Sequence, residues 1–137
     1  NELVPLNRKY DIATLMDAGV RYALRPADKG RHIAASVANA RAMVDDDPTV
    51  AWSLSDLARE AGLSRYQLVR QFAQATGLTP HAYLVQRRLH HARRLMRAGT
   101  PLAEVAAASG FADQSHLTRL FARSFGTTPH AYLRAHR

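Results

Sequence analysis

Two arginines, Arg70 and Arg119, stand 49 residues apart in segments that otherwise look alike. A guanidinium group presents a planar fork of N–H donors, and this fork matches the O6 and N7 acceptors of guanine in the major groove of DNA. Gln67 and Gln114 lie in the same two segments, and a glutamine amide can pair with adenine or contact a phosphate. These residue types predict nucleic-acid recognition, provided that the fold brings them to one surface.

The two segments are copies of one unit. Residues 80–84 read Pro-His-Ala-Tyr-Leu, and residues 129–133 repeat them letter for letter. Upstream, a Leu-x-x-x-Phe spacing occurs in both copies at the same offset, whereas the turn at residues 61–64 corresponds to residues 109–112 at an offset of 48. A repeat of this size determines the architecture, because each copy must form one supersecondary unit.

Helical periodicity dominates from Arg31 onward, and Gly and Pro fall at helix boundaries. No alternating run indicates a sheet. The sequence therefore predicts an all-α fold of about seven helices, in two helix-turn-helix subdomains joined by a long bridging helix. The expected elements are a leading helix over 31–45, a first helix-turn-helix over 53–76, the bridging helix over 80–98, a second helix-turn-helix over 101–125 and a final helix over 129–136.

Capping residues mark the expected helix starts. Ser64 and Asp113 each precede the second helix of a unit, where a side-chain oxygen can accept from a free backbone N–H. Three Thr-Pro pairs, at 79–80, 100–101 and 128–129, predict an N-cap followed by proline at the first helical position.

The second helix of each unit has two faces. Leu68 and Phe72 in the first unit, and Leu117 and Phe121 in the second, are expected to be buried. The other faces carry Tyr66, Val69, Arg70 and Ala73 in the first unit, and Ser115, Thr118, Arg119 and Ala122 in the second. The N-terminal part of such a helix enters the major groove, so these faces are the candidate DNA contacts. The small alanines would permit close approach.

The charge is unevenly placed. The net charge is +8, and residues 61–137 hold eleven arginines against two acids, whereas residues 1–60 hold nine acids against eight basic residues. A strongly basic segment indicates a polyanionic partner. The alternative is solubilising surface charge, or a genome whose codon usage favours Arg and Ala. Five arginines of the bridging helix are expected to form a solvated face, some of it near phosphates: Arg87, Arg88, Arg93, Arg94 and Arg97.

Other classes of protein find little support. The chain has no cysteine, no catalytic motif, no signal peptide and no apolar run long enough to span a membrane. His90 and His91 are adjacent, so on a helix they point about 100° apart and cannot chelate one ion well. The sequence therefore predicts a cytoplasmic protein that is not an enzyme and uses no metal or cofactor.

The second unit resembles a known family. The run from Gly110 to Phe121, followed by Phe125 to Tyr132, closely resembles the signature of the AraC/XylS family of bacterial transcription regulators. The resemblance covers about residues 31–136 and implies two recognition helices that enter successive major-groove segments on one face of DNA. Missing cysteines separate the chain from the DNA-repair relatives of that family, which need a thiolate.

The resemblance also implies base contacts. They fall on Tyr66, Val69 and Arg70 in the first unit, and on Gln114, Ser115, His116 and Arg119 in the second. Val69 departs from the polar residue often found there, although valine can touch a thymine methyl. Arg65 and Gln67 are counted with the DNA-binding residues. The alternatives are surface side chains for the arginines and His116, and packing on the turn for Tyr66.

Residues 1–30 are interpreted as a linker or a remnant of an upstream effector or dimerisation domain, and residues 31–137 as the DNA-binding domain. The expected partners are double-stranded DNA, RNA polymerase, and a small-molecule effector bound by an upstream domain outside this chain. Two rival interpretations stay open: a non-specific architectural DNA-binding protein, and a helical protein-interaction module.

Overall fold

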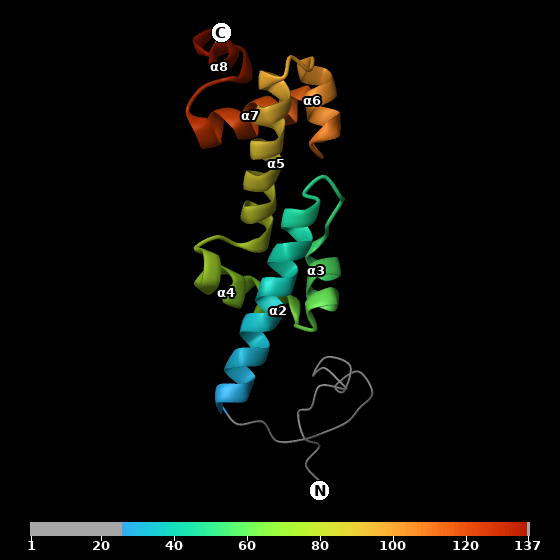
Figure 1. The fold of residues 1–137 in the computed structure, drawn as a ribbon, viewed down its shortest axis with the longest axis vertical. Helices are drawn as coiled ribbons and strands as arrows, with labels where there is room; N and C mark the ends of the chain where they lie inside the picture. Colours follow the sequence, from blue (N-terminus) through green and yellow to red (C-terminus); the bar gives the residue numbers. More distant parts are fainter. Residues whose placement is uncertain (1–25, 137) are drawn as a thin grey trace, which may run out of the picture.

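The computed structural model describes residues 26–136, which form seven α-helices and no strand. The helices are α2 (Pro26–Asp46), α3 (Leu54–Ala61), α4 (Arg65–Thr76), α5 (Pro80–Arg97), α6 (Leu102–Ala108), α7 (Gln114–Phe125) and α8 (Pro129–Ala135). In Figure 1, α5 runs along the long axis and joins a half made of α2, α3 and α4 to a half made of α6, α7 and α8. The predicted all-α architecture is confirmed. Within the described residues, no helix combines the length and apolar character that crossing a bilayer requires.

Most of the expected helix starts are confirmed by their caps. The Ser64 side chain accepts from the backbone N–H of Gln67 at 3.1 Å, and Asp113 accepts from that of His116 at 2.7 Å. Thr79 and Thr128 cap α5 and α8, each with proline in the first turn.

The prediction for Thr100 is wrong. Helix α6 begins at Leu102 behind Pro101, and no side chain caps it. The backbone N–H of Thr100 instead donates to the carbonyl of Leu95 and so closes the end of α5. Only two residues separate the Thr-Pro pair from the last residue of α5. The backbone of Thr100 therefore completes the end of α5, and its side chain does not cap α6.

The leading helix begins earlier than expected. Residues 1–30 are interpreted from the sequence as a linker or a domain remnant, with the leading helix expected to begin at residue 31, but Pro26 to Gly30 belong to α2. Proline is compatible with the first turn of a helix, and a single glycine inside a helix costs only about 1 kcal/mol. The Pro and Gly therefore mark the start of a helix here and not a break. The sequence also predicts a helix over residues 11–24, but these residues lie outside the part of the chain that the structure describes.

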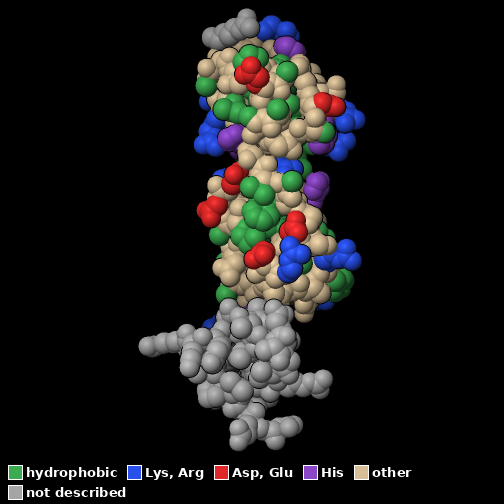
Figure 2. Space-filling model, turned by 90° about the vertical axis from the view of Figure 1, so that its right-hand side faces the viewer, with side chains coloured by type: hydrophobic (Ala, Val, Ile, Leu, Met, Phe, Trp, Pro, Cys, Tyr) green, Lys and Arg blue, Asp and Glu red, His purple; other side chains and the backbone are tan. Residues whose placement is uncertain are grey.

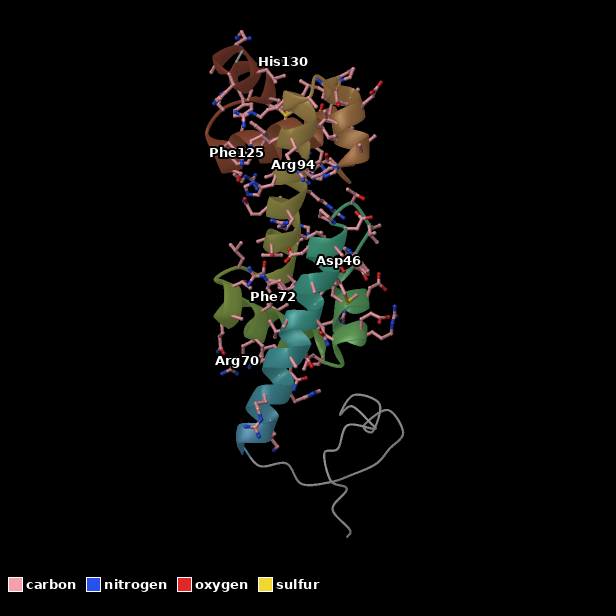
Figure 3. The ribbon with its side chains drawn as sticks, in the orientation of Figure 1. Asp46, Arg70, Phe72, Arg94, Phe125 and His130 are labelled. Atoms are coloured by element: carbon pink, nitrogen blue, oxygen red, sulfur yellow. The ribbon has the colours of Figure 1, made fainter. Side chains whose placement is uncertain are left out.

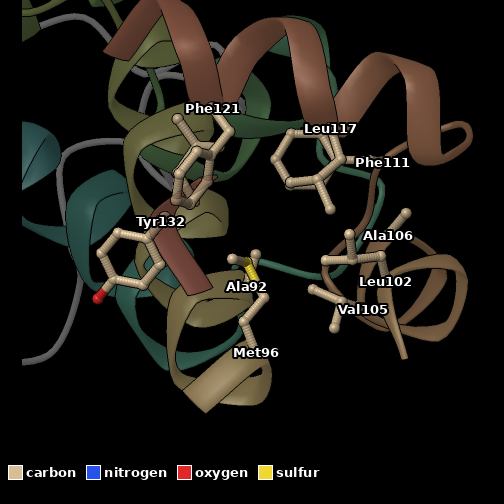
Figure 4. Close-up of a cluster of buried hydrophobic side chains, with 10 residues drawn as sticks. Ala92, Met96, Leu102, Val105, Ala106, Phe111, Leu117, Phe121 and Tyr132 are labelled. Carbon is tan, nitrogen blue, oxygen red and sulfur yellow. The ribbon is translucent and has the colours of Figure 1, made fainter. Parts of the chain in front are cut away.

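The two halves have separate hydrophobic cores. The first holds Val37, Ala40, Val44, Leu57, Ala58, Ala61, Leu68, Phe72 and Leu84. The second, which Figure 4 shows, holds Leu89, Ala92, Met96, Leu102, Val105, Ala106, Phe111, Leu117, Phe121 and Tyr132. Helix α5 is the element common to both, because it supplies Leu84 to one core and Leu89, Ala92 and Met96 to the other.

The buried faces agree with the sequence patterns at their centres. Leu68, Phe72, Leu117 and Phe121 are all 0% exposed, as predicted. The apolar pattern of α7 also includes Leu120 and Phe125, but these two side chains are only partly covered. They flank the apolar stripe of α7, where the core ends.

One buried hydroxyl in the second half lacks a partner. Ser109 ends α6 at 0% exposure, and its Oγ forms no hydrogen bond. The first copy has Ala61 at the corresponding position, also buried. Leaving a buried polar group unsatisfied costs about 1–3 kcal/mol. We therefore expect Ser109→Ala to raise the free energy of unfolding by about 1 kcal/mol in urea denaturation.

The reciprocal substitution supplies the control. Ala61→Ser should lower the free energy of unfolding by a similar amount, because it places a hydroxyl in the matching apolar position. A Ser109→Ala variant less stable than the parent would mean that the hydroxyl is satisfied in solution.

Candidate nucleic-acid interface

The two recognition helices lie on the same side of the bridging helix. In Figure 1, α4 and α7 extend on the left of α5, while the support helices α3 and α6 lie on its right. This arrangement arises because each copy packs its Leu-x-x-x-Phe stripe inward, against α5 among other neighbours. The repeat in sequence thus becomes a repeat in space, with both recognition helices on the same side of α5.

The outward face of α4 is open to solvent at its N-terminal end. Tyr66 is 72% exposed, the largest value among the exposed apolar side chains of the described residues. Arg65 and Arg70 are also exposed, whereas Val69 is half-buried. Figure 3 shows Arg70 pointing outward from α4. The predicted division of α4 into a packed face and a free face is confirmed, and Tyr66 does not pack on the turn.

The outward face of α7 has the same layout. Gln114, Ser115 and Arg119 are exposed, and Thr118 is half-buried above the core. Within residues 26–136, neither Arg70 nor Arg119 forms an ion pair or a side-chain hydrogen bond. Both guanidinium groups therefore keep all their donors for another molecule.

Two of the predicted contact residues have a role inside the protein. Gln67 and His116 occupy the same position in the two copies. The Gln67 Oε1 accepts from the backbone N–H of Ser64 at 3.0 Å, and the His116 Nδ1 accepts from that of Ala112 at 3.3 Å. The His116 ring also meets the edge of Phe111, with centroids 5.5 Å apart. Both side chains hold the turn in front of the recognition helix, and only their remaining nitrogens point to other partners.

The prediction that the five arginines of α5 form a solvated face is partly wrong. Arg94 and Arg97 are exposed, as predicted. Arg87 pairs with the Asp45 carboxylate at 3.2 Å. Arg88 is half-buried, and partial burial lowers the pKa of its guanidinium below the ordinary value. It binds the backbone of the loop between α2 and α3, which no helical pattern in the sequence could indicate.

The two tyrosines of the repeated run pack inside the protein. Tyr132 is 9% exposed, and Tyr83 meets the edge of Phe72 with centroids 5.3 Å apart. The Tyr83 hydroxyl donates to Asp45 at 2.6 Å and accepts from Arg41 at 3.1 Å. Burial, together with the hydrogen bond to Asp45, raises the pKa of Tyr83.

The two recognition helices themselves carry no acidic side chain. The exposed acids lie at the end of α2 and on α3 and α6, with Asp113 at the cap of α7. Figure 2 looks onto the side that carries α3 and α6, where acidic side chains are interspersed with basic ones. The side that carries α4 and α7 is therefore the one suited to a polyanion.

Two helix-turn-helix units that present arginines on one side of a shared helix define a two-headed DNA-binding domain. A family model described as a helix-turn-helix domain matches residues 57–135, which include both units. A crystal structure of an AraC-type regulator from Chromobacterium violaceum has a TM-score of 0.66 and 29% identity, over 73% of this chain and 89% of that one. The chain belongs to the AraC-type helix-turn-helix family.

Further relatives are regulators of transcription by name. The DNA-binding domain of the global transcriptional factor AdpA, solved with a target DNA, has a TM-score of 0.71 and 30% identity over 74% of this chain and 93% of that one. The regulator YbfI of Bacillus subtilis is 38% identical over 65 residues, and MtrA of Neisseria gonorrhoeae is 36% identical over 75. These matches cover 47% and 53% of this chain but only 24% and 25% of the two regulators.

Proposed function

We propose that this chain is the part of a bacterial transcription regulator that reads DNA sequence, with α4 and α7 in successive major-groove segments. The observation that carries the proposal is that α4 and α7 lie on one side of α5, each with an exposed arginine, Arg70 or Arg119, that is unpaired within the described residues. The likeness to the AdpA domain, which was solved with a target DNA, supports it.

The proposed contacts divide by chemistry. Arg70 and Arg119 read guanine through two hydrogen bonds each, and Gln114 and Ser115 read or position neighbouring bases. Tyr66 and Val69 offer apolar contact to thymine methyl groups, and Arg65 neutralises a phosphate. Gln67 and His116 contribute one remaining nitrogen each, because their other polar atom holds the turn.

The wider roles belong to the whole regulator. Relatives several times longer than the matched segment imply a further domain, which we propose binds an effector or a second subunit. Regulation would follow when the DNA-bound protein contacts or positions RNA polymerase. A regulator of bacterial genes works in the cytoplasm, and it needs no catalytic group to do so.

A salt titration of DNA binding tests the proposal. Each phosphate that a protein neutralises adds about −0.9 to the slope of log affinity against log salt. If the protein neutralises about six to ten phosphates, the affinity for duplex DNA should fall on the order of 10³- to 10⁵-fold between about 50 and 200 mM salt. A flat plot would favour a protein-interaction module.

A second measurement separates sequence reading from architectural binding. Selection from a randomised duplex library should enrich two short motifs about one helical turn apart, roughly 10 base pairs. Steep salt dependence without any enriched motif would identify a non-specific architectural protein.

A further inference from the structure

The relative orientation of the two halves does not follow from a common core. Their hydrophobic clusters are separate, and the extensive helix contacts between the halves all involve α5. A single helix between two cores can twist or bend unless other contacts restrain it. The geometry of the two recognition helices therefore depends on what lies beside the middle of α5.

Arg88 stands at that place, between Leu84 in the first core and Leu89 in the second. Its Nε donates to the carbonyl oxygen of Pro48 at 2.7 Å, and its Nη2 donates to that of Val50 at 2.8 Å. The guanidinium group thus fastens the loop between α2 and α3 to the bridging helix. This loop belongs to the first half.

The second half also packs against the Arg88 side chain. The turn between α6 and α7 contains Gly110, whose φ is +87°. A Cβ atom at Gly110 would lie 2.9 Å from the Arg88 Nε and 3.3 Å from the carbonyl oxygen of Thr49. The turn that leads into α7 is therefore packed directly against Arg88 and the loop that Arg88 holds.

We propose that Arg88 sets the orientation of α7 relative to α4, and with it the spacing between the two DNA segments that the protein accepts. This inference rests on the proposed function. Arg88 is a positioning residue, because it acts through the loop at residues 48–50 and the turn at Gly110. One inserted base pair moves the second segment by about 3.4 Å and rotates it by about 35°. A protein whose two halves are rigidly connected should bind the lengthened site poorly. A protein whose halves can move relative to each other should adjust to it.

Binding to spaced operators tests the proposal. The operator selected by the parent protein is compared with the same operator carrying one extra base pair between its two motifs. The parent should lose about tenfold in affinity or more, the order of one base-pair contact. Arg88→Met keeps much of the side-chain volume but removes both hydrogen bonds. It should lose much less on insertion and should bind a single motif as the parent does.

Arg87→Met is the matched control, since the ion pair of Arg87 joins α5 to Asp45 of the first half and does not involve the turn at Gly110. It should keep the parent's spacing penalty. Gly110→Ala disturbs the same contact from the second half, because its Cβ would collide with the Arg88 side chain. It should relax the spacing preference as Arg88→Met does. An unchanged penalty in both variants overturns the proposal.

A distance measurement keeps the test independent of DNA. The chain has no cysteine, so Gln74→Cys and Arg123→Cys place spin labels at two exposed and equivalent positions on α4 and α7. The distribution of distances should be narrow in the parent background and clearly broader with Arg88→Met, at an unchanged helical signal. Identical distributions overturn the proposal. A parent that selects no operator would instead refute the proposed function, and the distances would still decide the role of Arg88.

Discussion

Phe121→Ala is expected to lower the free energy of unfolding by about 3–5 kcal/mol, the usual cost of emptying a fully buried aromatic site. Phe121 is 0% exposed in the second core, where its ring meets Phe125 and Tyr132 at centroid distances of 4.6 and 5.5 Å. Because the cores are separate, the second half should unfold at a lower denaturant concentration than the first half.

Two spectroscopic probes can show where the structure is lost. The only tryptophan, Trp52, packs against the first core. In Phe121→Ala, helical circular dichroism should begin to fall at a lower urea concentration than Trp52 fluorescence changes. In the equivalent substitution Phe72→Ala, both signals should begin to change together, and the Trp52 transition should be complete while part of the helical signal remains. Coincident transitions in both variants would mean that α5 makes the two halves one cooperative unit.

Tyr66→Ala is the surface control for these core substitutions. Tyr66 is 72% exposed, so its removal should change the free energy of unfolding by less than about 0.5 kcal/mol. A larger loss would show that the ring packs against the protein in solution and is not available to DNA.

Arg119→Ala is expected to weaken binding to the selected operator by about 1–3 kcal/mol, or roughly 5- to 150-fold, and to relax discrimination at one base pair. Arg119 has no ion pair or side-chain hydrogen bond within the described residues, so the melting temperature should barely change. A loss of affinity at an unchanged melting temperature would assign the effect to DNA recognition and not to stability. Competition among duplexes randomised at each position measures both the affinity and the relaxed base pair.

Arg97→Ala distinguishes base reading from general charge. Arg97 is the exposed last residue of α5 and lines a pocket with Leu133 and His136, at the end of the molecule that carries α8. Its removal should weaken all duplexes alike or have no effect. If Arg119→Ala and Arg97→Ala give the same profile across the randomised duplexes, the assignment of Arg119 to base reading is wrong.

Much of the fold follows from local patterns in the sequence. The repeat at an offset of 49 predicted two copies of one unit, and the Leu-x-x-x-Phe spacing predicted which face of α4 and α7 is buried. Ser64 and Asp113 marked the helix starts, because capping involves neighbours three residues away. Such interactions are local, so a single sequence reveals them. The exposed faces with Arg70 and Arg119 follow from the same periodicity, and their contacts with DNA remain predictions.

The sequence predicted the bridging helix, but only the tertiary structure decided which side-chain contacts hold the two halves relative to each other. Arg88 looks like its exposed neighbours on α5, yet its partners Pro48 and Val50 lie 40 and 38 residues away in the sequence. Every residue has a backbone carbonyl, so no sequence motif indicates which carbonyl will accept such a hydrogen bond. Gly110 read as a turn residue, and only the fold showed that its missing side chain makes room for Arg88. Periodicity determines which side of a helix is apolar, whereas the meeting of distant polar groups depends on how the helices pack.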